Sequence, residues 1–309
     1  MYGKAEGPGT VPFYCDPSRV GAFAIEPGEL ARGESPALFH LFVALSMFQA
    51  LRDVVIMRQQ RTMTAEAVES LVSATILELR LKHHDCEHLS SAEMFERRCD
   101  VHKGKTGVDC RSRPGAECHV KAATFLFRRM GDMGKLPTSA WLRVWKNGAL
   151  AKGLAVVRQG EPDPQRRAEQ LVDHFAQVHR VGRKLATMFV SALSTPALAP
   201  GLTPWAPDVD GNRLLVVDTN VARAVDALRP PGAVRSYEVR AAWLREHAAQ
   251  VNLRDFRDDV PSCSPRIVQQ ALYHFCSKSN REVQGLDCRG ASVPCKVCAP
   301  SLCPLGREV

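Results

Sequence analysis

Residues 163–193 read DPQRRAEQLVDHFAQVHRVGRKLATMFVSAL. Asp163 followed by proline is typical of a helix start, because aspartate caps the first turn and proline fits the first helical position. Apolar residues then recur at helical spacing over residues 168–178, and again over residues 185–193. The four residues 179–182 between these stripes include a glycine. We therefore predict two helices joined by a tight turn, a helix-hairpin-helix.

The second helix of this hairpin is predicted to begin just after Gly182. The exposed N–H groups and the positive dipole end of a helix start can hold a phosphate group. Arg180, Arg183 and Lys184 add positive charge at the same point. Such a hairpin binds a nucleic-acid backbone without reading bases, so we expect DNA contacts from residues 180–183, including Val181. A helical corner in a packed domain has the same pattern, and this segment alone leaves both interpretations open.

The composition is that of an ordinary globular protein. The chain has 309 residues, of which 45% are hydrophobic and 24% charged, which excludes a wholly disordered or collagen-like chain. Helical spacing dominates and alternating strand patterns are weak, so we predict an all-α protein with at most a small strand pair near the central cysteines. No apolar run approaches the roughly 18 residues that span a bilayer, and no signal peptide is visible. We therefore expect a cytoplasmic protein with no membrane partner.

Composition shifts along the chain predict three parts. Residues 1–34 are rich in Gly and Pro and are expected to form an extended N-terminal arm. Residues 35–213 are expected to form a helical-barrel domain that carries the hairpin. Residues 214–309 are expected to form a C-terminal helical domain that ends in a cysteine-containing loop.

The net charge of +8 is concentrated in one segment. Residues 97–146 carry twelve Lys and Arg against four Asp and Glu, an excess of eight positive charges. A concentrated basic segment is expected of a polyanion-binding protein. A solvated basic face would have the same composition, and the sequence does not separate the two.

A second marker follows the hairpin. The apolar residues 214–217 lead directly to Asp218, which begins a predicted helix whose buried face is Val221, Val225 and Leu228. Helix capping alone would explain an aspartate at this position. The functional interpretation depends on whether Asp218 meets the lysine of the hairpin.

The cysteines point to metal binding, because eleven cysteines in a reducing compartment do not favour a disulfide framework. Four of them near the C-terminus have the spacing C-x6-C-x2-C-x4-C, which suits a tetrahedral zinc or a cubane iron–sulfur cluster. These four are Cys288, Cys295, Cys298 and Cys303. Cys276 is either a substitute ligand or a buried cysteine at a helix end.

A second metal site in the middle of the chain is left open. The spacings between Cys99, Cys110 and Cys118 match no familiar zinc pattern. Further ligands could come from Cys86, His102 or His119.

At the hairpin, the aspartate and the C-terminal cysteines, the sequence resembles the endonuclease III-like family of helix-hairpin-helix DNA glycosylases. The family's hairpin is similar to LPGVGRKTA, where residues 178–186 read VHRVGRKLA. Its aspartate segment is similar to VDTHxxRV, where residues 217–224 read VDTNVARA. Its cluster loop is C-x6-C-x2-C-x5-C, one residue longer in the last gap. Two departures are Arg180 in place of the first hairpin glycine and an apparent insertion over residues 196–213.

The resemblance implies a two-lobed helix-hairpin-helix DNA glycosylase fold with a C-terminal [4Fe-4S] cluster loop, the cluster being held by the four C-terminal cysteines. It implies Lys184 as nucleophile and Asp218 as the catalytic carboxylate. It also implies that Gln49, expected in an early helix, fills the gap left by a flipped base. The partner would be double-stranded DNA containing a damaged or modified base, and the protein would be a nucleoid-associated monomer.

These residue types suit the chemistry. Breaking an N-glycosidic bond builds positive charge on the sugar, which a nearby carboxylate stabilises. A deprotonated amine can attack C1′ and form a Schiff base. By resemblance to the family, a lysine at this place implies AP-lyase activity. The alternative is a non-catalytic helix-hairpin-helix DNA-binding module with a structural metal site. A metal-dependent nuclease is disfavoured because no suitable D-x-D arrangement is found. Oxidised pyrimidines are the favoured substrate, with other lesions, mismatches and modified bases of foreign DNA left open.

Overall fold

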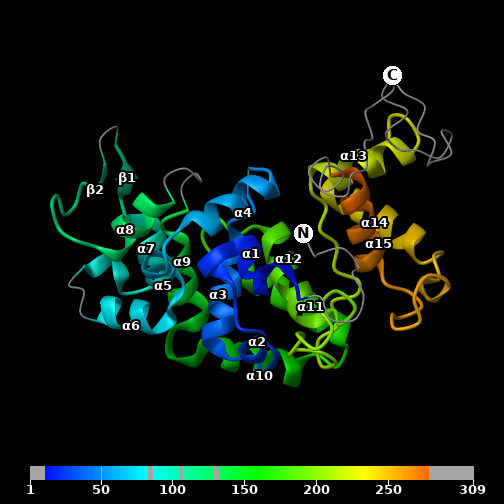
Figure 1. Cartoon of the computed structure of the whole chain (residues 1–309), viewed down its shortest axis with the longest axis horizontal. Coiled ribbons are helices and arrows are strands. Elements are labelled where there is room, and N and C mark those ends of the chain that lie inside the picture. The colour runs from blue at the N-terminus through cyan, green and yellow to red at the C-terminus, as the bar shows by residue number, and fades with distance from the viewer. Residues whose placement is uncertain (1–10, 50, 83–85, 105–106, 128–132, 278–309) are drawn as a thin grey trace.

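The computed structural model describes residues 11–49, 51–82, 86–104, 107–127 and 133–277. As predicted, the protein is mostly helical, and the described residues contain a single two-stranded sheet. Buried apolar side chains form three clusters. We call the parts of the chain that hold these clusters the first lobe (the described residues within 11–82 and 133–214), the cysteine lobe (residues 86–127) and the second lobe (residues 215–277). In Figure 1 the first lobe lies in the middle, with the cysteine lobe on its left and the second lobe on its right.

The first lobe is built around the second helix of the hairpin, in which every residue from Leu185 onward is buried. Aromatic rings surround this helix, and Phe189 contacts both Phe42 and Phe175 at centroid distances of 5.0 and 4.8 Å. The helices of this lobe are η1 (Phe13–Cys15), α1 (Pro17–Val20), η2 (Gly21–Phe23), α2 (Pro27–Ala31), α3 (Ser35–Ser46), α4 (Asp53–Thr62), α5 (Ala65–Val72), α6 (Ala74–Lys82), α9 (Leu136–Ala140), the π-helix η4 (Trp141–Trp145), η5 (Lys146–Gly148), α10 (Ala149–Gly160), α11 (Pro164–Phe175) and α12 (Arg183–Ser194).

The extended arm expected over residues 1–34 is wrong for the part that is described. Residues 11–34 fold into short helices, and the Phe13 and Phe23 side chains are fully buried in the first lobe. The Phe13 ring packs edge-on against Phe48, 5.4 Å away. Gly21, at φ +60°, lets the chain approach the backbone of α4, where an added Cβ would lie 2.8 Å from the Arg61 Cα. The glycines and prolines here therefore permit close packing rather than an open arm.

The cysteine lobe contains the small strand pair that the sequence left as a possibility. Val101 pairs with Cys110 in an antiparallel register. The buried core of this lobe is small, since it consists of Leu89, Phe95, Val101, Cys110 and Val120. Its elements are η3 (Glu87–Leu89), α7 (Ala92–Arg98), β1 (Val101–Lys103), β2 (Val108–Cys110) and α8 (His119–Leu126).

Residues 214–217 connect the first and second lobes as an extended segment. Leu214 and Val216 are buried in the core of the first lobe, whereas Leu215 and Val217 are buried in that of the second. This alternation is the period of extended backbone, whose successive side chains point to opposite sides. The second lobe contains α13 (Thr219–Leu228), α14 (Tyr237–Ala248), η6 (Leu253–Asp255) and α15 (Pro265–Cys276).

Helix α13 begins after Asp218, as predicted, and buries Val221 and Val225. The expectation that Leu228 belongs to the buried face is wrong, since this last residue of α13 is 44% exposed. Among the helices that are described, none has the length and apolar character needed to cross a bilayer.

Candidate active site

Helices α11 and α12 form the predicted hairpin. Asp163 caps α11 by accepting a hydrogen bond from the Gln165 N–H at 3.0 Å. The turn is closed by a hydrogen bond of 2.9 Å from the Val181 N–H to the Val178 carbonyl. Gly182 is the N-cap of α12 and supplies no side chain that could cover the start of the helix.

Arg180 takes the backbone conformation of a glycine. Its φ is +64°, in the left-handed region that favours glycine, and it stands where the resembling family has the first hairpin glycine. A non-glycine residue pays on the order of 1–2 kcal/mol for this conformation. Arg180 therefore combines a left-handed turn with a positive charge at the exposed tip of the hairpin.

The other residues predicted to contact DNA differ in exposure. Gly182 and Arg183 are exposed, and an added Cβ at Gly182 would meet no atom within 4 Å. Val181 is only 3% exposed, so its side chain belongs to the core and only its backbone is suited to a phosphate contact. Arg183 forms an exposed ion pair with Asp173 at 2.6 Å, which lowers its availability as a free charge.

Lys184 turns from the start of α12 towards the loop between α3 and α4. Its Nζ donates a hydrogen bond to the Phe48 carbonyl at 3.3 Å, and the side chain is half-buried. Gln49 is the next residue, so the structure brings these two predicted site residues into one region. The expectation that Gln49 lies within a helix is wrong, because α3 ends at Ser46. Its side-chain amide instead donates to the Ser46 carbonyl at 2.7 Å and so covers the end of that helix.

Asp218 lies in the same electrostatic neighbourhood as Lys184. Its Oδ1 accepts the Val221 N–H at 2.8 Å and thereby caps α13. Burial raises the pKa of the Asp218 carboxyl above its ordinary value, and the negative charge of Asp53 raises it further. The cap hydrogen bond and the positive charge of Lys184 lower this pKa, but burial outweighs them. Lys184, Asp53 and Asp218 are therefore close enough to influence one another.

Asp53 and Tyr273 complete this group, and sequence reasoning missed both. Asp53 is the first residue of α4 in the first lobe, and it accepts a hydrogen bond from the hydroxyl of Tyr273, on α15 in the second lobe. Burial, followed by the charge of Asp53, raises the pKa of Tyr273 well above its ordinary value. The hydroxyl is therefore protonated at neutral pH and joins the two lobes beside Asp218.

Arg266 fixes α15 against the hairpin. It is 1% exposed, and its Nε donates to the Ser191 Oγ on α12 at 3.1 Å. Its Nη1 donates to the side-chain oxygens of Gln269 and Gln270 at 2.5 and 3.0 Å. A planar guanidinium with several fixed acceptors holds one orientation, so the position of α15, and hence of Tyr273, is tied to α12.

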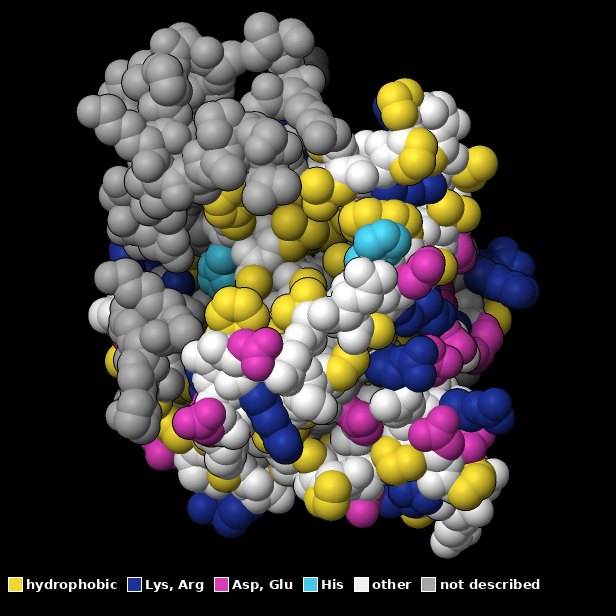
Figure 2. All heavy atoms as spheres, turned by 90° about the vertical axis from the view of Figure 1, so that its right-hand side faces the viewer, with side chains coloured by type: hydrophobic (Ala, Val, Ile, Leu, Met, Phe, Trp, Pro, Cys, Tyr) yellow, Lys and Arg dark blue, Asp and Glu magenta, His cyan; other side chains and the backbone are white. Residues whose placement is uncertain are grey.

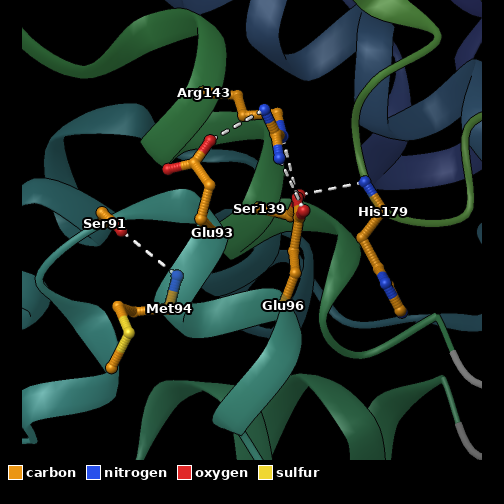
Figure 3. Close-up of polar contacts among 7 residues, drawn as sticks. All are labelled: Ser91, Glu93, Met94, Glu96, Ser139, Arg143 and His179. Carbon is orange, nitrogen blue, oxygen red and sulfur yellow. Dashed lines mark hydrogen bonds and ion pairs between the residues drawn. The ribbon is translucent and has the colours of Figure 1, made fainter.

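A second polar network supports the hairpin turn (Figure 3). Ser139, which is fully buried, accepts the His179 N–H at 3.0 Å and donates to the Glu96 carboxylate at 2.6 Å. Arg143 also donates to Glu96, from Nε at 3.0 Å and from Nη2 at 2.7 Å. Ser139 thus links Glu96, on α7 of the cysteine lobe, to the hairpin turn.

The basic segment 97–146 is only partly available to a polyanion. Arg97, Arg98 and Arg111 are exposed. In contrast, Lys121 is ion-paired with Asp109 at 2.8 Å, and Arg143 is engaged with Glu96 as described.

The surface of the second lobe is mixed in charge. Figure 2 looks onto this lobe, and its visible Lys and Arg side chains are interspersed with Asp and Glu. That face carries no single-sign surface among the side chains drawn in colour.

The four C-terminal cysteines, Cys288, Cys295, Cys298 and Cys303, lie outside the described residues. Cys276 is fully buried at the last position of α15, where a buried structural cysteine was one of its two predicted roles.

Comparisons of the chain with protein-family models, curated proteins and solved structures gave no match.

Proposed function

We propose that the protein is a DNA glycosylase with AP-lyase activity, which excises a damaged or modified base from double-stranded DNA. The observation that carries the proposal is that Lys184, near the exposed start of α12, lies close enough to Asp218, at the start of α13, to lower the pKa of its carboxyl. A backbone clamp would need a helix start, but it would need neither an amine nor a half-buried carboxylate next to it.

In this proposal the residues act in sequence on one flipped nucleotide. The exposed backbone at Gly182 and the charge of Arg180 hold a phosphate, and the base leaves the stack before it reacts. The Asp218 carboxylate stabilises the positive charge that develops at C1′. Lys184, after losing a proton, forms a bond to C1′ as the base departs with the glycosidic electron pair. The departing base takes up the proton released by the amine, so Asp218 stays ionised while the charge develops.

Asp53 and Tyr273 are positioning residues in this scheme. The charge of Asp53 keeps the pKa of Asp218 high, and the Tyr273 hydrogen bond fixes Asp53. Gln49, next to the Lys184 acceptor, is the proposed residue that fills the gap left by the flipped base.

The remaining parts of the proposal come from the sequence. A [4Fe-4S] cluster held by Cys288, Cys295, Cys298 and Cys303 would order the C-terminal loop, and the protein would act as a nucleoid-associated monomer in the cytoplasm. Purified protein should then be brown and contain about four iron atoms per chain. Colourless protein with one zinc bound by these cysteines would replace the cluster by a zinc site.

The test is borohydride trapping on abasic DNA, together with a panel of duplexes that each carry one lesion or modified base. The protein is expected to form a covalent adduct and to release at least one base. Lys184→Ala should abolish the adduct and leave DNA affinity nearly unchanged. Lys152→Ala, on an exposed face of α10, is the matched control and should trap normally. Trapping by Lys184→Ala at the normal level contradicts the assignment of the nucleophile.

One observation favours the alternative of a non-catalytic DNA-binding module, since the Asp218 side chain already has a structural role as the cap of α13. Asp218→Asn separates the two functions, because asparagine caps a helix as well as aspartate does. The proposed enzyme loses base release in this variant while its free energy of unfolding is maintained. If no duplex releases a base and no adduct forms with the unaltered protein, the binding module is the better description.

A further inference from the structure

The cysteine lobe encloses a small cavity lined by four cysteines. Its volume is about 20 Å³, enough for a single water-sized body. No disulfide joins the cysteines, which are all free thiols. The sulfur-bearing residues of the lining are Cys86, Cys99, Cys110 and Cys118, and His88 lies beside them.

The fold brings these cysteines together from four separate elements. Cys86 precedes η3, and Cys99 follows the last residue of α7. Cys110 ends β2, opposite Val101, and Cys118 is the N-cap of α8. Despite this separation along the chain, all four cysteines line the same cavity.

We infer that Cys86, Cys99, Cys110 and Cys118 bind one zinc ion as a four-thiolate structural site. Four sulfur ligands around a cavity the size of one ion suit a metal that binds soft ligands in tetrahedral geometry. Zinc is the common occupant of such sites. The inference concerns the folding of the cysteine lobe and stands independently of the proposed glycosylase activity.

The surroundings provide the charge that such a site needs. A zinc ion with four thiolates carries a net charge of −2. Two cationic residues line the same cavity, Arg113 and Lys121, of which Lys121 is also ion-paired with Asp109. A third, Lys135, donates from Nζ to the Cys99 carbonyl at 2.5 Å. Positive groups and hydrogen bonds around the ligands stabilise a thiolate site and fix the ligand backbone.

The lobe has a small core of its own, although α8 also buries Ala123 in the core of the first lobe. Its strands are three residues each, and its core has five buried side chains. A two-stranded β-hairpin of this size with so small a core is not stable in isolation. Small domains commonly obtain the missing stability from a structural metal, whose binding energy becomes folding energy.

The four cysteine side chains are not arranged as a tetrahedral site in the described structure. Within the described residues, no three His, Cys, Asp or Glu side chains already surround one point at ligand distance. Cys110 Sγ instead donates to the Asp100 Oδ1 at 2.8 Å, which only a protonated thiol can do. Zinc binding therefore releases the thiol protons to solvent and turns Cys110 from Asp100 towards the cavity.

Zinc binding is also expected to stabilise the turn between α11 and α12. The connection runs through α7, which lies between two of the proposed ligands, Cys86 and Cys99. Glu96 on α7 holds Ser139, which in turn holds the His179 N–H in the hairpin turn (Figure 3). Loss of the metal is therefore expected to loosen the turn as well as the cysteine lobe.

The test measures metal content and ligation in the full-length protein. Elemental analysis should find about one zinc per chain in addition to any iron. Cys99→Ser and Cys118→Ser should each lose the zinc, whereas Cys263→Ser, at an exposed cysteine outside the lobe, should keep it. Cys295→Ser should lose the metal of the C-terminal cysteines, whether iron or a second zinc, and keep one zinc. Absence of zinc, retention of the full zinc content in both lobe variants, or loss of all zinc in Cys295→Ser overturns the inference.

X-ray absorption at the zinc edge of the unaltered protein provides a measurement that needs no variant. Four sulfur neighbours at about 2.3 Å are expected. A shell of nitrogen and oxygen alone overturns the inference, even if the cysteine variants fail to fold.

Discussion

Ser139→Ala is expected to destabilise the protein through the network that supports the hairpin. Ser139 is fully buried and makes one hydrogen bond as donor, to Glu96, and one as acceptor, from the His179 N–H. Loss of a hydrogen bond to a charged group costs about 1.5–3 kcal/mol, and an unsatisfied backbone N–H costs about 1–3 kcal/mol. Because Glu96 retains both hydrogen bonds from Arg143, we expect a total near the lower end of the summed range, about 2.5–4 kcal/mol.

Urea unfolding followed by circular dichroism measures this loss as a lower midpoint with an unchanged slope. Thr138→Val is the matched control. Thr138 is the preceding residue and equally buried, but its hydroxyl has no hydrogen-bond partner in the described part of the chain. Its replacement should leave stability unchanged or raise it. If Ser139→Ala unfolds at the same urea concentration as Thr138→Val, the network does not stabilise the hairpin.

Three further predictions concern the candidate site. Asp53→Asn removes a charge that raises the pKa of Asp218, so the Asp218 carboxylate persists to lower pH. The acid limb of the pH profile of single-turnover base release should therefore move to lower pH. An acid limb that stays in place or moves to higher pH contradicts the shared site. Arg180→Gly should raise the free energy of unfolding by up to ~1 kcal/mol, because glycine adopts the left-handed backbone without strain, and it should weaken DNA binding. Arg180→Ala should weaken DNA binding without raising the free energy of unfolding. Urea unfolding and DNA titration measure the two effects. Tyr273→Phe should lower the melting temperature and shift the same pH limb, because Asp53 loses its fixed partner; a pH profile identical to that of the unaltered protein would limit Tyr273 to a structural role.

The local features of the hairpin could be predicted from the sequence. Asp163, the apolar stripes and Gly182 define the ends of α11 and α12, because capping and periodicity involve residues within a few positions of one another. The start of α13 after Asp218 follows from the same kind of signal.

The site residues contributed by distant helices could not be predicted. Asp53 and Tyr273 are 220 positions apart, and no local pattern links the first turn of α4 to the last turn of α15. Their contact depends on how the lobes pack, which Arg266 helps to fix from a buried position. The packed helices over residues 11–34 were missed for a related reason. Glycine and proline indicate turns, but they do not reveal that the intervening aromatic side chains find a core.

The segment that joins the lobes restricts how this chain can change in length. Leu214 and Val216 face one core while Leu215 and Val217 face the other. Deleting or inserting a single residue there would exchange the two sets and send each side chain to the wrong partner. Related chains should therefore differ at this joint by even numbers of residues, and any odd change should be accompanied by a bulge that restores the alternation.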